Sequence, residues 1–202
     1  YKILDDYEIN EVKKIILEAE YAVFFGGAGV STESGIPDFR SKQGLYSGEG
    51  AEYFLSIRCL EKEPERFYEF FRSNLMHPYA EPNDAHVALV SLEERGLIQA
   101  IITQNIDGLH QMAGSTEVIE LHGNASKFYC PICGKRYTVE YVMSEVDAPR
   151  CKSCNGIIRP DITLYGEPLD SGEFYRAEEE IFNADVLIVG GTSLTVNPAA
   201  SL

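Results

Sequence analysis

YAVFFGGAGVSTESGIPDFR occupies residues 21–40 and decides the fold of this chain. Its first part, Tyr21–Phe25, is a short apolar and aromatic run closed by glycines, which is typical of a buried β-strand. A glycine loop after such a strand predicts the start of a nucleotide-binding βαβ unit, with backbone N–H groups that can cradle a pyrophosphate. Gly27 and Gly29 supply two glycines of the G-x-G-x-x-G pattern, but Thr32 stands at the third position and the loop runs on to Arg40.

The rest of the chain alternates helical and extended patterns. Apolar residues at helical spacing predict helices over residues 8–20, 64–76, 83–95 and 173–183. Short apolar runs predict further strands over residues 98–102, 118–121 and 186–189. This alternation indicates the α/β class, and we expect a Rossmann-like parallel sheet with helices on both faces. Polar, glycine-containing stretches follow the strands and should line a ligand crevice; they are residues 26–40, 103–109, 122–124 and 190–197.

Four of the five cysteines form two C-x-x-C pairs separated by 17 residues. Two disulfides are the weaker hypothesis, because no secretion signal is present and the spacing is that of a zinc site. Each pair turns two thiolates toward one ion, so the two pairs complete a tetrahedron with no open position. We therefore expect a structural Zn²⁺ in an inserted zinc-binding module at residues 125–160, too small for a core of its own. Its ligands would be Cys130, Cys133, Cys151 and Cys154.

The chain carries 32 acidic and 17 basic residues, which gives a formal net charge of −15. Such an excess keeps a surface well solvated, and it also suits a basic partner such as a lysine-rich peptide. A direct nucleic-acid partner is disfavoured, because no basic patch is present to neutralise phosphates. No apolar run reaches the length of a membrane span, and the charged N-terminal residues lack a signal-peptide pattern. We therefore expect a cytoplasmic protein with no membrane partner.

The polar stretches after the strands contain side chains that could act together on a ligand. Residues 103–108 place amides and a carboxylate directly after a predicted strand, and His122 stands at a strand end beside a glycine. Alone, His122 is explained as well by a structural role as by catalysis, and a lone G-x-G loop is weak evidence. Their combination at strand ends carries the functional hypothesis and argues against a non-catalytic zinc-ribbon adaptor.

Six motifs of this chain occur in the order in which the sirtuins, NAD-dependent protein lysine deacylases, carry them. They are GAGVSTESGIPDFR, TQNIDGLH, LHGN, the paired C-x-x-C motifs, IRPDITLYGE and GTSLTVNPA, and they span nearly the whole chain from residue 21 onward. No single motif is specific, but the ordered set is. The chain thus resembles a sirtuin of bacterial or archaeal type, and the long tail of the glycine loop suits NAD that is cleaved rather than returned intact.

The resemblance implies a role for each residue that matches a family motif. Phe39 would shield the reacting ribose, and Ile106 and Asp107 would bind the nicotinamide carboxamide. The whole set of NAD contacts would be Gly27, Ala28, Gly29, Thr32, Phe39, Arg40, Gln104, Asn105, Ile106, Asp107, His122, Gly191, Thr192 and Ser193. The substrate peptide would bind as a strand between two segments, in contact with Thr163, Leu164, Tyr165, Gly166, Glu167, Val196 and Asn197.

By the same resemblance, the reaction is NAD-dependent protein lysine deacetylation. Nicotinamide would leave the ribose, and the amide oxygen of an acetyl-lysine-containing protein or peptide would attack from the opposite face. The catalytic residues would be His122, as general base on a ribose hydroxyl, and Asn105, which would hold the ribose and its water. The products would be free lysine, nicotinamide and acetyl-ADP-ribose. Mono-ADP-ribosyl transfer to a protein side chain is the alternative, because it begins with the same cleavage of NAD.

The resemblance also suggests how the chain divides. The Rossmann-like NAD-binding domain would comprise residues 1–45, 78–124 and 161–202, and residues 46–77 would form the helical cofactor-loop part of a small domain. Family members continue past the GTSL motif with a strand, a loop that contacts adenine and a closing helix. We therefore expect the adenine site to be incomplete in a chain that stops at Leu202. The stretch 46–61 is short for a loop that closes over NAD, so a mobile cofactor loop is expected there.

The helix expected at residues 64–76 bears on the acyl group that is removed. It carries no Tyr-x-x-Arg pair, which marks the sirtuins that remove succinyl and malonyl groups. Tyr68 and Arg72 stand four apart instead, and a shift of one residue turns a helical side chain by about 100°. An apolar Phe71 favours acetyl or longer uncharged acyl groups, because a carboxylate there would be desolvated without a cation.

Overall fold

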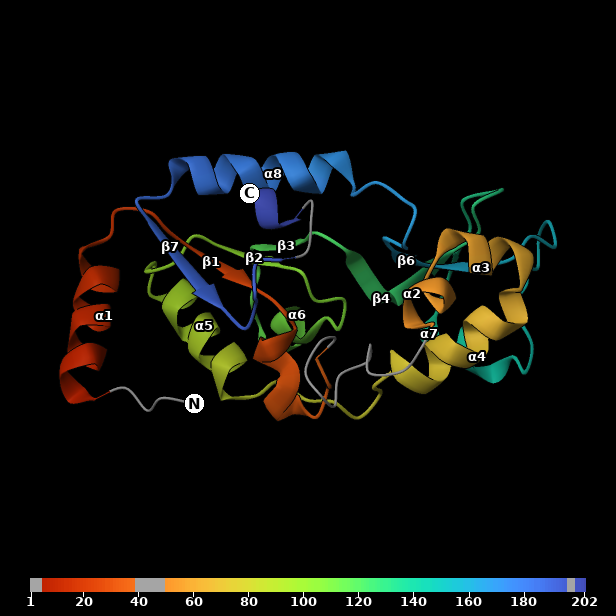
Figure 1. The fold of residues 1–202 in the computed structure, drawn as a ribbon, viewed down its shortest axis with the longest axis horizontal. Coiled ribbons are helices and arrows are strands. Elements are labelled where there is room, and N and C mark those ends of the chain that lie inside the picture. Colours follow the sequence, from red (N-terminus) through yellow and green to blue (C-terminus); the bar gives the residue numbers. More distant parts are fainter. Residues whose placement is uncertain (1–4, 39–49, 196–198) are drawn as a thin grey trace.

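Two β-sheets organise the chain in the computed structural model, which describes residues 5–38, 50–195 and 199–202 (Figure 1). The larger sheet is parallel and has the strand order β3-β2-β1-β7. β2 and β3 are added in sequence on one side of β1, and β7 is then added on the other side of β1. This reversal is the Rossmann-like arrangement. The predicted fold class is confirmed. The strands of this sheet are β1 (Ala22–Gly26), β2 (Ala100–Thr103), β3 (Val118–Glu120) and β7 (Val186–Gly190).

Helices cover both faces of this sheet because β1 is apolar on both sides. Successive side chains of a strand alternate between faces, so Val23 and Phe25 pack on one side and Phe24 on the other. The first side is covered by α8 (Ser171–Asn183) and the short 3₁₀ helix η3 (Ala199–Ser201), and the second by α5 (Asp84–Glu94) and α6 (Leu109–Ala113). After the glycine loop the chain forms a 3₁₀ helix, η1 (Ala28–Ser34). Figure 1 shows α8 on one face of the sheet and α5 on the other.

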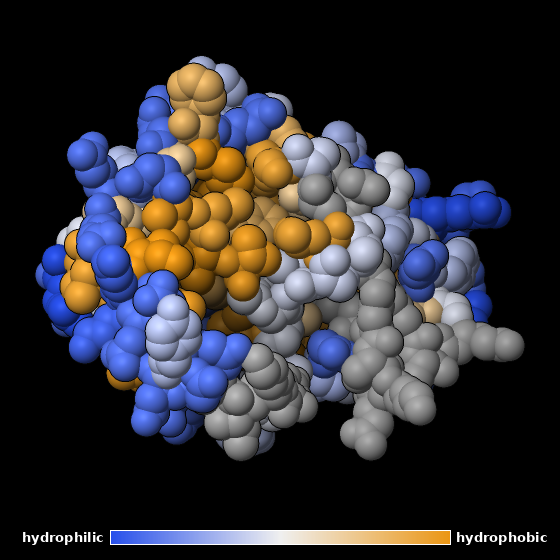
Figure 2. Space-filling view, turned by 60° about the vertical axis from the view of Figure 1, so that its left-hand side comes forward, coloured by the Kyte–Doolittle hydropathy of each residue, from blue (hydrophilic) through white to orange (hydrophobic). Residues whose placement is uncertain are grey.

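The predicted N-terminal helix is present as α1 (Asp6–Glu18), but its apolar stripe is not buried. Asp5 and Glu8 form a capping box that fixes its start. Within the described part of the chain none of its residues is buried, and Ile9 and Ile15 are about half exposed. The edge strand β7 begins near the end of α1 (Figure 1). Two of its apolar side chains, Leu187 and Val189, are also exposed. Figure 2 shows the apolar area on the side of the molecule that carries these two elements.

Among the residues that the structure describes, the second lobe combines a smaller antiparallel sheet with four helices. The sheet has the order β5-β4-β6. Phe67, Tyr68 and Phe71 of α4 pack against Phe128 of β4 and Ile158, and all five side chains are buried. The cysteine module therefore shares one core with the helices that precede it, which agrees with the expectation that it is too small for a core of its own. The elements are α2 (Ala51–Phe54), α3 (Ile57–Lys62), α4 (Pro64–Asn74), β4 (Gly123–Tyr129), β5 (Arg136–Tyr137), α7 (Val139–Ser144) and β6 (Arg159–Ile162).

The predicted elements are found close to where the patterns place them. The strand expected at 98–102 begins later, at Ala100, and the helix expected at 64–76 ends earlier, at Asn74. His77 lies in the connection between α4 and α5. Across the described ranges of the chain, no helix combines the length and the apolar character needed to cross a membrane.

Gly123 lies where the chain passes from the parallel sheet to the antiparallel sheet, and there is no space for a side chain at this position. It begins β4 and pairs with Ile162 of β6, while its φ of 77° is in the left-handed region. A Cβ atom at this position would lie 2.1 Å from the carbonyl oxygen of Asp161. Because Gly123 directly follows His122, this contact also fixes where the candidate catalytic histidine stands.

We predict that Gly123→Ala lowers the free energy of unfolding by clearly more than the ordinary cost of a left-handed alanine. Gly96, with a φ of 68° and open space around its Cα, supplies the matched variant Gly96→Ala. That change should cost about 1–2 kcal/mol, whereas Gly123→Ala adds a steric clash with the β6 backbone and should cost at least about 3 kcal/mol. Urea unfolding midpoints of the two variants decide the point, and equal losses would contradict it.

Candidate active site

The loops after β1 and β7 approach each other so closely that glycine is required in both. Gly29 N–H donates to the carbonyl oxygen of Gly191 at 2.8 Å, and Gly27 N–H donates to that of Gly190 at 3.2 Å. A Cβ on Gly29 would lie 2.8 Å from Gly191 Cα. These two N–H groups are therefore committed to the neighbouring loop, so the glycines serve close packing of the loops rather than an open phosphate cradle.

The TQNID segment ties the ends of three strands together. Gln104 Nε2 donates to Thr192 Oγ1 at 2.9 Å, and its backbone N–H donates to the carbonyl of Gly26 at 3.0 Å. Asn105 is buried, and its Nδ2 donates to Ser31 Oγ at 3.1 Å. Since parallel strands end at one edge of the sheet, side chains from distant parts of the sequence meet there.

Ser31 is a member of this cluster that the sequence reasoning missed. Its side chain is 1% exposed, and its hydroxyl donates to Asp107 Oδ2 at 2.7 Å while it accepts from Asn105. Asp107 Oδ1 accepts from Leu109 N–H at 2.9 Å, which fixes the carboxylate at the start of α6. The sequence offered one signal for this role, a hydroxyl side chain within the glycine loop, between Gly29 and Thr32.

His122 lies at the end of β3 with its ring held in one orientation. Nδ1 is 2.8 Å from the carbonyl oxygen of Gln104. Because a carbonyl oxygen can only accept, Nδ1 carries the proton of the neutral ring and Nε2 is the basic nitrogen. Burial lowers the pKa of His122, and the hydrogen bond to Gln104 opposes this only in part. The imidazole therefore stays neutral, and able to accept a proton, at neutral pH and somewhat below.

A pair of buried histidines lies behind Asp107. The rings of His86 on α5 and His110 on α6 meet edge to face with centroids 4.8 Å apart, and both side chains are at most 1% exposed. Neither ring nitrogen of His110 has a hydrogen-bond partner among the described residues. Burial, together with the neighbouring His86, lowers the pKa of His110 to about 4, so both rings are neutral packing groups at neutral pH.

The segment 163–167, expected to bind a peptide, is firmly held by the rest of the protein. Thr163 N–H donates to the carbonyl of His122 at 2.9 Å. Tyr165 exchanges backbone hydrogen bonds with the α2–α3 connection, since its N–H donates to Leu55 and its carbonyl accepts from Ile57. Glu167 binds Arg159 and the N–H of Leu164. A substrate strand therefore cannot pair with the N–H groups of 163–165.

The remaining predicted site residues are distributed as follows. Thr32 Oγ1 donates back to the carbonyl of Gly29 at 3.0 Å, and Ser193 is exposed, with its hydroxyl 2.8 Å from that of Thr195. Ile106 packs on the core of the second lobe, and its carbonyl accepts from Ala125. Four predicted residues lie outside the described ranges: Phe39, Arg40, Val196 and Asn197.

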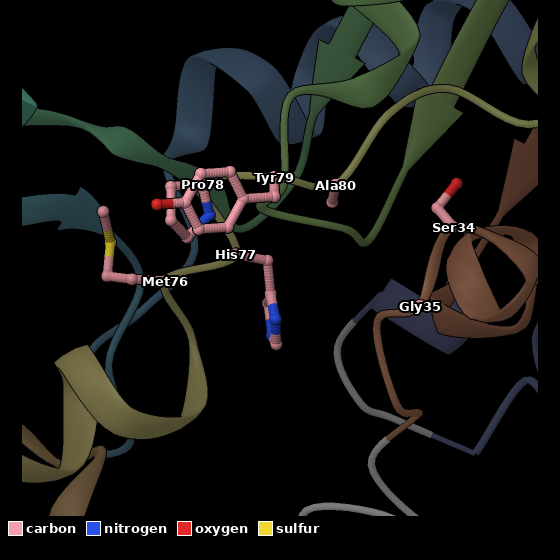
Figure 3. A pocket seen from close by; sticks show the side chains of 7 residues that line it. All are labelled: Ser34, Gly35, Met76, His77, Pro78, Tyr79 and Ala80. Carbon is pink, nitrogen blue, oxygen red and sulfur yellow. The ribbon is translucent and has the colours of Figure 1, made fainter.

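A cavity of about 340 Å³ lies between the end of η1 and the connection from α4 to α5 (Figure 3). None of the polar side chains gathered at the strand ends lines it. Figure 3 shows that its walls come from two segments of the chain, the connection on one side and the end of η1 on the other. The cavity is thus distinct from the candidate catalytic cluster. The lining residues are Ser34, Gly35, Met76, His77, Pro78, Tyr79 and Ala80.

The four paired cysteines converge in the second lobe as the spacing predicts. Their sulfur atoms all lie within 4.8 Å of one another, and Cys130 and Cys154 are 3.4 Å apart. None of the chain's cysteines, all in described ranges, forms a disulfide. Zn–S bonds of about 2.3 Å in a tetrahedron set sulfurs about 3.8 Å apart, so the cluster fits one Zn²⁺. Tyr137 adds an outer contact, since its hydroxyl donates to Cys151 Sγ at 3.1 Å.

The fold and the site together define a Rossmann-like nucleotide-binding protein with a structural four-cysteine zinc module. The chain matches the model of the Sir2 family over residues 27–198. An NAD-dependent protein deacetylase of Clostridium perfringens is 50% identical over 202 residues, which cover 98% of this chain and 83% of that relative. This chain therefore belongs to the Sir2 family.

Solved structures of the family superpose closely on this chain. A Sir2 structure described with a deacetylated p53 peptide and 3′-O-acetyl ADP ribose has a TM-score of 0.89 and 44% identity, with coverage of 96% of this chain and 80% of the other. A structure described as Sir2 with a p53 peptide and NAD⁺ has a TM-score of 0.85 and 44% identity, with coverage of 96% and 79%. The predicted resemblance is thus confirmed in both sequence and fold.

We predict that Cys151→Ala lowers the zinc content and the melting temperature together. Cys151 is buried in the shared core and supplies one of four thiolates, so its loss opens the site and removes metal-binding free energy from the fold. Metal analysis of the purified protein and thermal unfolding measure the two effects. Cys59→Ala, a buried cysteine outside the cluster, is the matched control and should keep its zinc. Less than about half a zinc per wild-type chain would contradict the four-thiolate site.

Proposed function

We propose that this chain is an NAD-dependent protein lysine deacetylase, which transfers the acyl group from lysine to ADP-ribose with release of nicotinamide. The observation that carries the proposal is the oriented His122. The carbonyl of Gln104 holds its Nδ1, which leaves Nε2 as the basic nitrogen. His122 and the buried Asn105 both lie at the same edge of the parallel sheet, where its strands end. A zinc scaffold without catalysis has no use for a buried cluster of this kind.

The donor set at the strand ends fits a dinucleotide that is to be cleaved. Asn105, Ser31 and Asp107 form one hydrogen-bonded chain, so the amide and the carboxylate are oriented before any ligand binds. Bound NAD supplies a ribose carbon that carries a good leaving group. In our proposal Asp107 and Ile106 bind the carboxamide of that leaving group, and Asn105 orients the ribose.

His122 is the proposed general base of the acyl transfer. Its neutral ring accepts a proton at Nε2 from a ribose hydroxyl, while the N–H at Nδ1 keeps its bond to Gln104. When Nε2 takes the proton the imidazolium remains oriented by the same carbonyl. Because burial lowers the pKa of His122, the base remains unprotonated at pH values where an exposed histidine would already be charged.

Mono-ADP-ribosyl transfer begins with the same cleavage and differs in its acceptor. The relative of known structure that holds a deacetylated peptide beside acetyl ADP ribose shows acyl transfer to the sugar, and this favours deacetylation for the present chain. We further propose that the chain acts in the cytoplasm on acetyl-lysine-containing proteins or peptides. The proposed division remains a Rossmann-like domain (residues 1–45, 78–124 and 161–202), a helical part (46–77) and a zinc module (125–160).

We predict that the wild-type chain releases nicotinamide from NAD at a rate that depends on acetylated peptide, with acetyl-ADP-ribose as coproduct. His122→Ala should reduce this rate by about 10²–10⁴-fold, because it removes the general base. The measurement is nicotinamide release with and without acetylated peptide, with mass spectrometry of the sugar product.

His77→Ala is the matched control, since His77 lies outside the strand-end cluster and should retain the wild-type rate. Near-normal turnover by a folded His122→Ala protein would remove His122 from the mechanism. ADP-ribosylated peptide in place of acetyl-ADP-ribose would instead support the transferase alternative.

The structure also bears on which acyl group is accepted. Arg72 on α4 is occupied: its guanidinium donates to the carbonyl oxygens of Val142, Val146 and Asp147 at 2.9–3.1 Å. The buried Tyr68 hydroxyl donates to the carbonyl of Ile158 at 2.6 Å. Both side chains thus anchor α4 to the zinc module, and neither is available to an acyl carboxylate.

We predict that acetyl-lysine is preferred over succinyl-lysine by at least about a hundredfold in kcat/KM, roughly 2.7 kcal/mol. A succinyl carboxylate would lose its hydration without gaining a cation from α4. Acetyl and succinyl forms of one peptide, compared side by side, provide the measurement. A propionyl form serves as the control for size, since it lengthens the acyl chain without a charge. Comparable values for acetyl and succinyl peptides would mean that a cation does reach the acyl group.

A further inference from the structure

Arg159 and Glu167 form a two-pronged ion pair at the turn after β6. Arg159 Nη1 donates to Glu167 Oε1 at 2.6 Å, and Nη2 donates to Oε2 at 2.7 Å. Their side chains are only 11% and 22% exposed. A paired, two-pronged contact of this kind is stronger and more rigid than an exposed ion pair, because two parallel hydrogen bonds fix the relative orientation of both groups.

The same two side chains also hold the backbone of the turn. Arg159 Nη2 donates to the carbonyl of Ile162 at 2.9 Å and Nε to that of Pro160 at 3.3 Å. Glu167 Oε2 accepts the N–H of Leu164 at 2.9 Å. One guanidinium and one carboxylate thus cross-brace the whole stretch between residues 160 and 167.

This stretch connects the candidate base to the surface where the peptide is proposed to bind. Thr163 N–H holds the carbonyl of His122, and Tyr165 pairs with the α2–α3 connection on the other side. A change in the turn would therefore move the peptide-binding segment relative to His122. A misplacement of about 1 Å is enough to lower the rate by about a hundredfold, because the substrate is no longer held in the reactive geometry.

The carboxylate of Glu167 already accepts three hydrogen bonds within the protein. Both oxygens accept from Arg159, and one also accepts from Leu164. Burial alone would raise the pKa of Glu167, but these hydrogen bonds outweigh it and hold the pKa below its ordinary value, so the group is charged at neutral pH. A basic side chain of a substrate would therefore meet a carboxylate whose charge is already paired with the Arg159 guanidinium.

We propose that Arg159 and Glu167 are positioning residues that set the conformation of the peptide-binding segment, and that Glu167 does not itself recognise basic residues of the substrate. This inference rests on the proposed deacetylase function. Recognition of basic flanking residues by this acidic protein would then fall to other carboxylates.

The test is the KM for acetylated peptide of Glu167→Gln and Arg159→Lys, measured on three peptides with basic, neutral and acidic flanking residues. Glutamine keeps an acceptor for Leu164 and loses the charge, and lysine keeps the charge and loses the two-pronged geometry. We expect the peptide KM to rise about tenfold or more in both variants, by the same factor on all three peptides, with the KM for NAD within about twofold of wild type. The double variant should raise the peptide KM no more than either single variant does, because the two residues act as one unit.

Glu173→Gln, which breaks the exposed Arg176–Glu173 pair on α8, is the matched control and should change neither KM. A rise confined to the peptide with basic flanks would overturn the proposal in favour of direct recognition by Glu167. An unchanged peptide KM, or an equal rise in the KM for NAD, would overturn it as well. If Glu167→Gln does not fold, Arg159→Lys decides by the same outcomes. A wild-type chain without peptide-dependent nicotinamide release would instead refute the deacetylase function itself.

Discussion

The hydrogen bond from Gly29 N–H to the carbonyl of Gly191 is the contact on which the arrangement of the candidate site depends. It brings the loops after β1 and β7 together at a distance that excludes any side chain. With those loops closed, Thr192 is in reach of Gln104, and Gln104 in turn presents its carbonyl to His122. Four segments that are far apart in the sequence are thereby linked in a single chain of contacts. A site of this kind is oriented by the backbone before a ligand arrives, which is the condition for electrostatic catalysis.

The second lobe shows how a metal module is attached to an enzyme without a flexible connection. Phe71 stacks on Phe67 within α4 and meets Phe128 of β4 edge to face, while Arg72 of the same helix holds carbonyls around α7. The zinc ligands Cys130 and Cys151 are themselves part of this apolar core. Metal binding and burial of α4 are therefore one cooperative event rather than two independent ones.

Much of this structure could be predicted from local patterns, and the rest depends on contacts that no local pattern contains. The β1 strand, the capped α5 and the zinc ligands follow from apolar runs, capping residues and cysteine spacing within a few residues of each other. The roles of Gly29 and Ser31 do not, because each is defined by a partner more than 70 residues away in sequence: Gly191 for the first, Asn105 and Asp107 for the second. Glu167 is a different case, because its partner Arg159 lies only eight residues away. The sequence suggests a carboxylate that contacts substrate, and only the fold shows that the carboxylate is paired with Arg159.

The buried histidine pair behind Asp107 sets a limit on the acidity that the fold tolerates. His110 has its pKa lowered to about 4 by burial and by the nearby His86, whereas in the unfolded chain it would titrate near 6.5. Between these values the unfolded chain takes up protons that the folded chain refuses, so acid draws the equilibrium toward unfolding. The contribution of this pair to stability is complete above about pH 6.5 and declines as the pH falls toward 4.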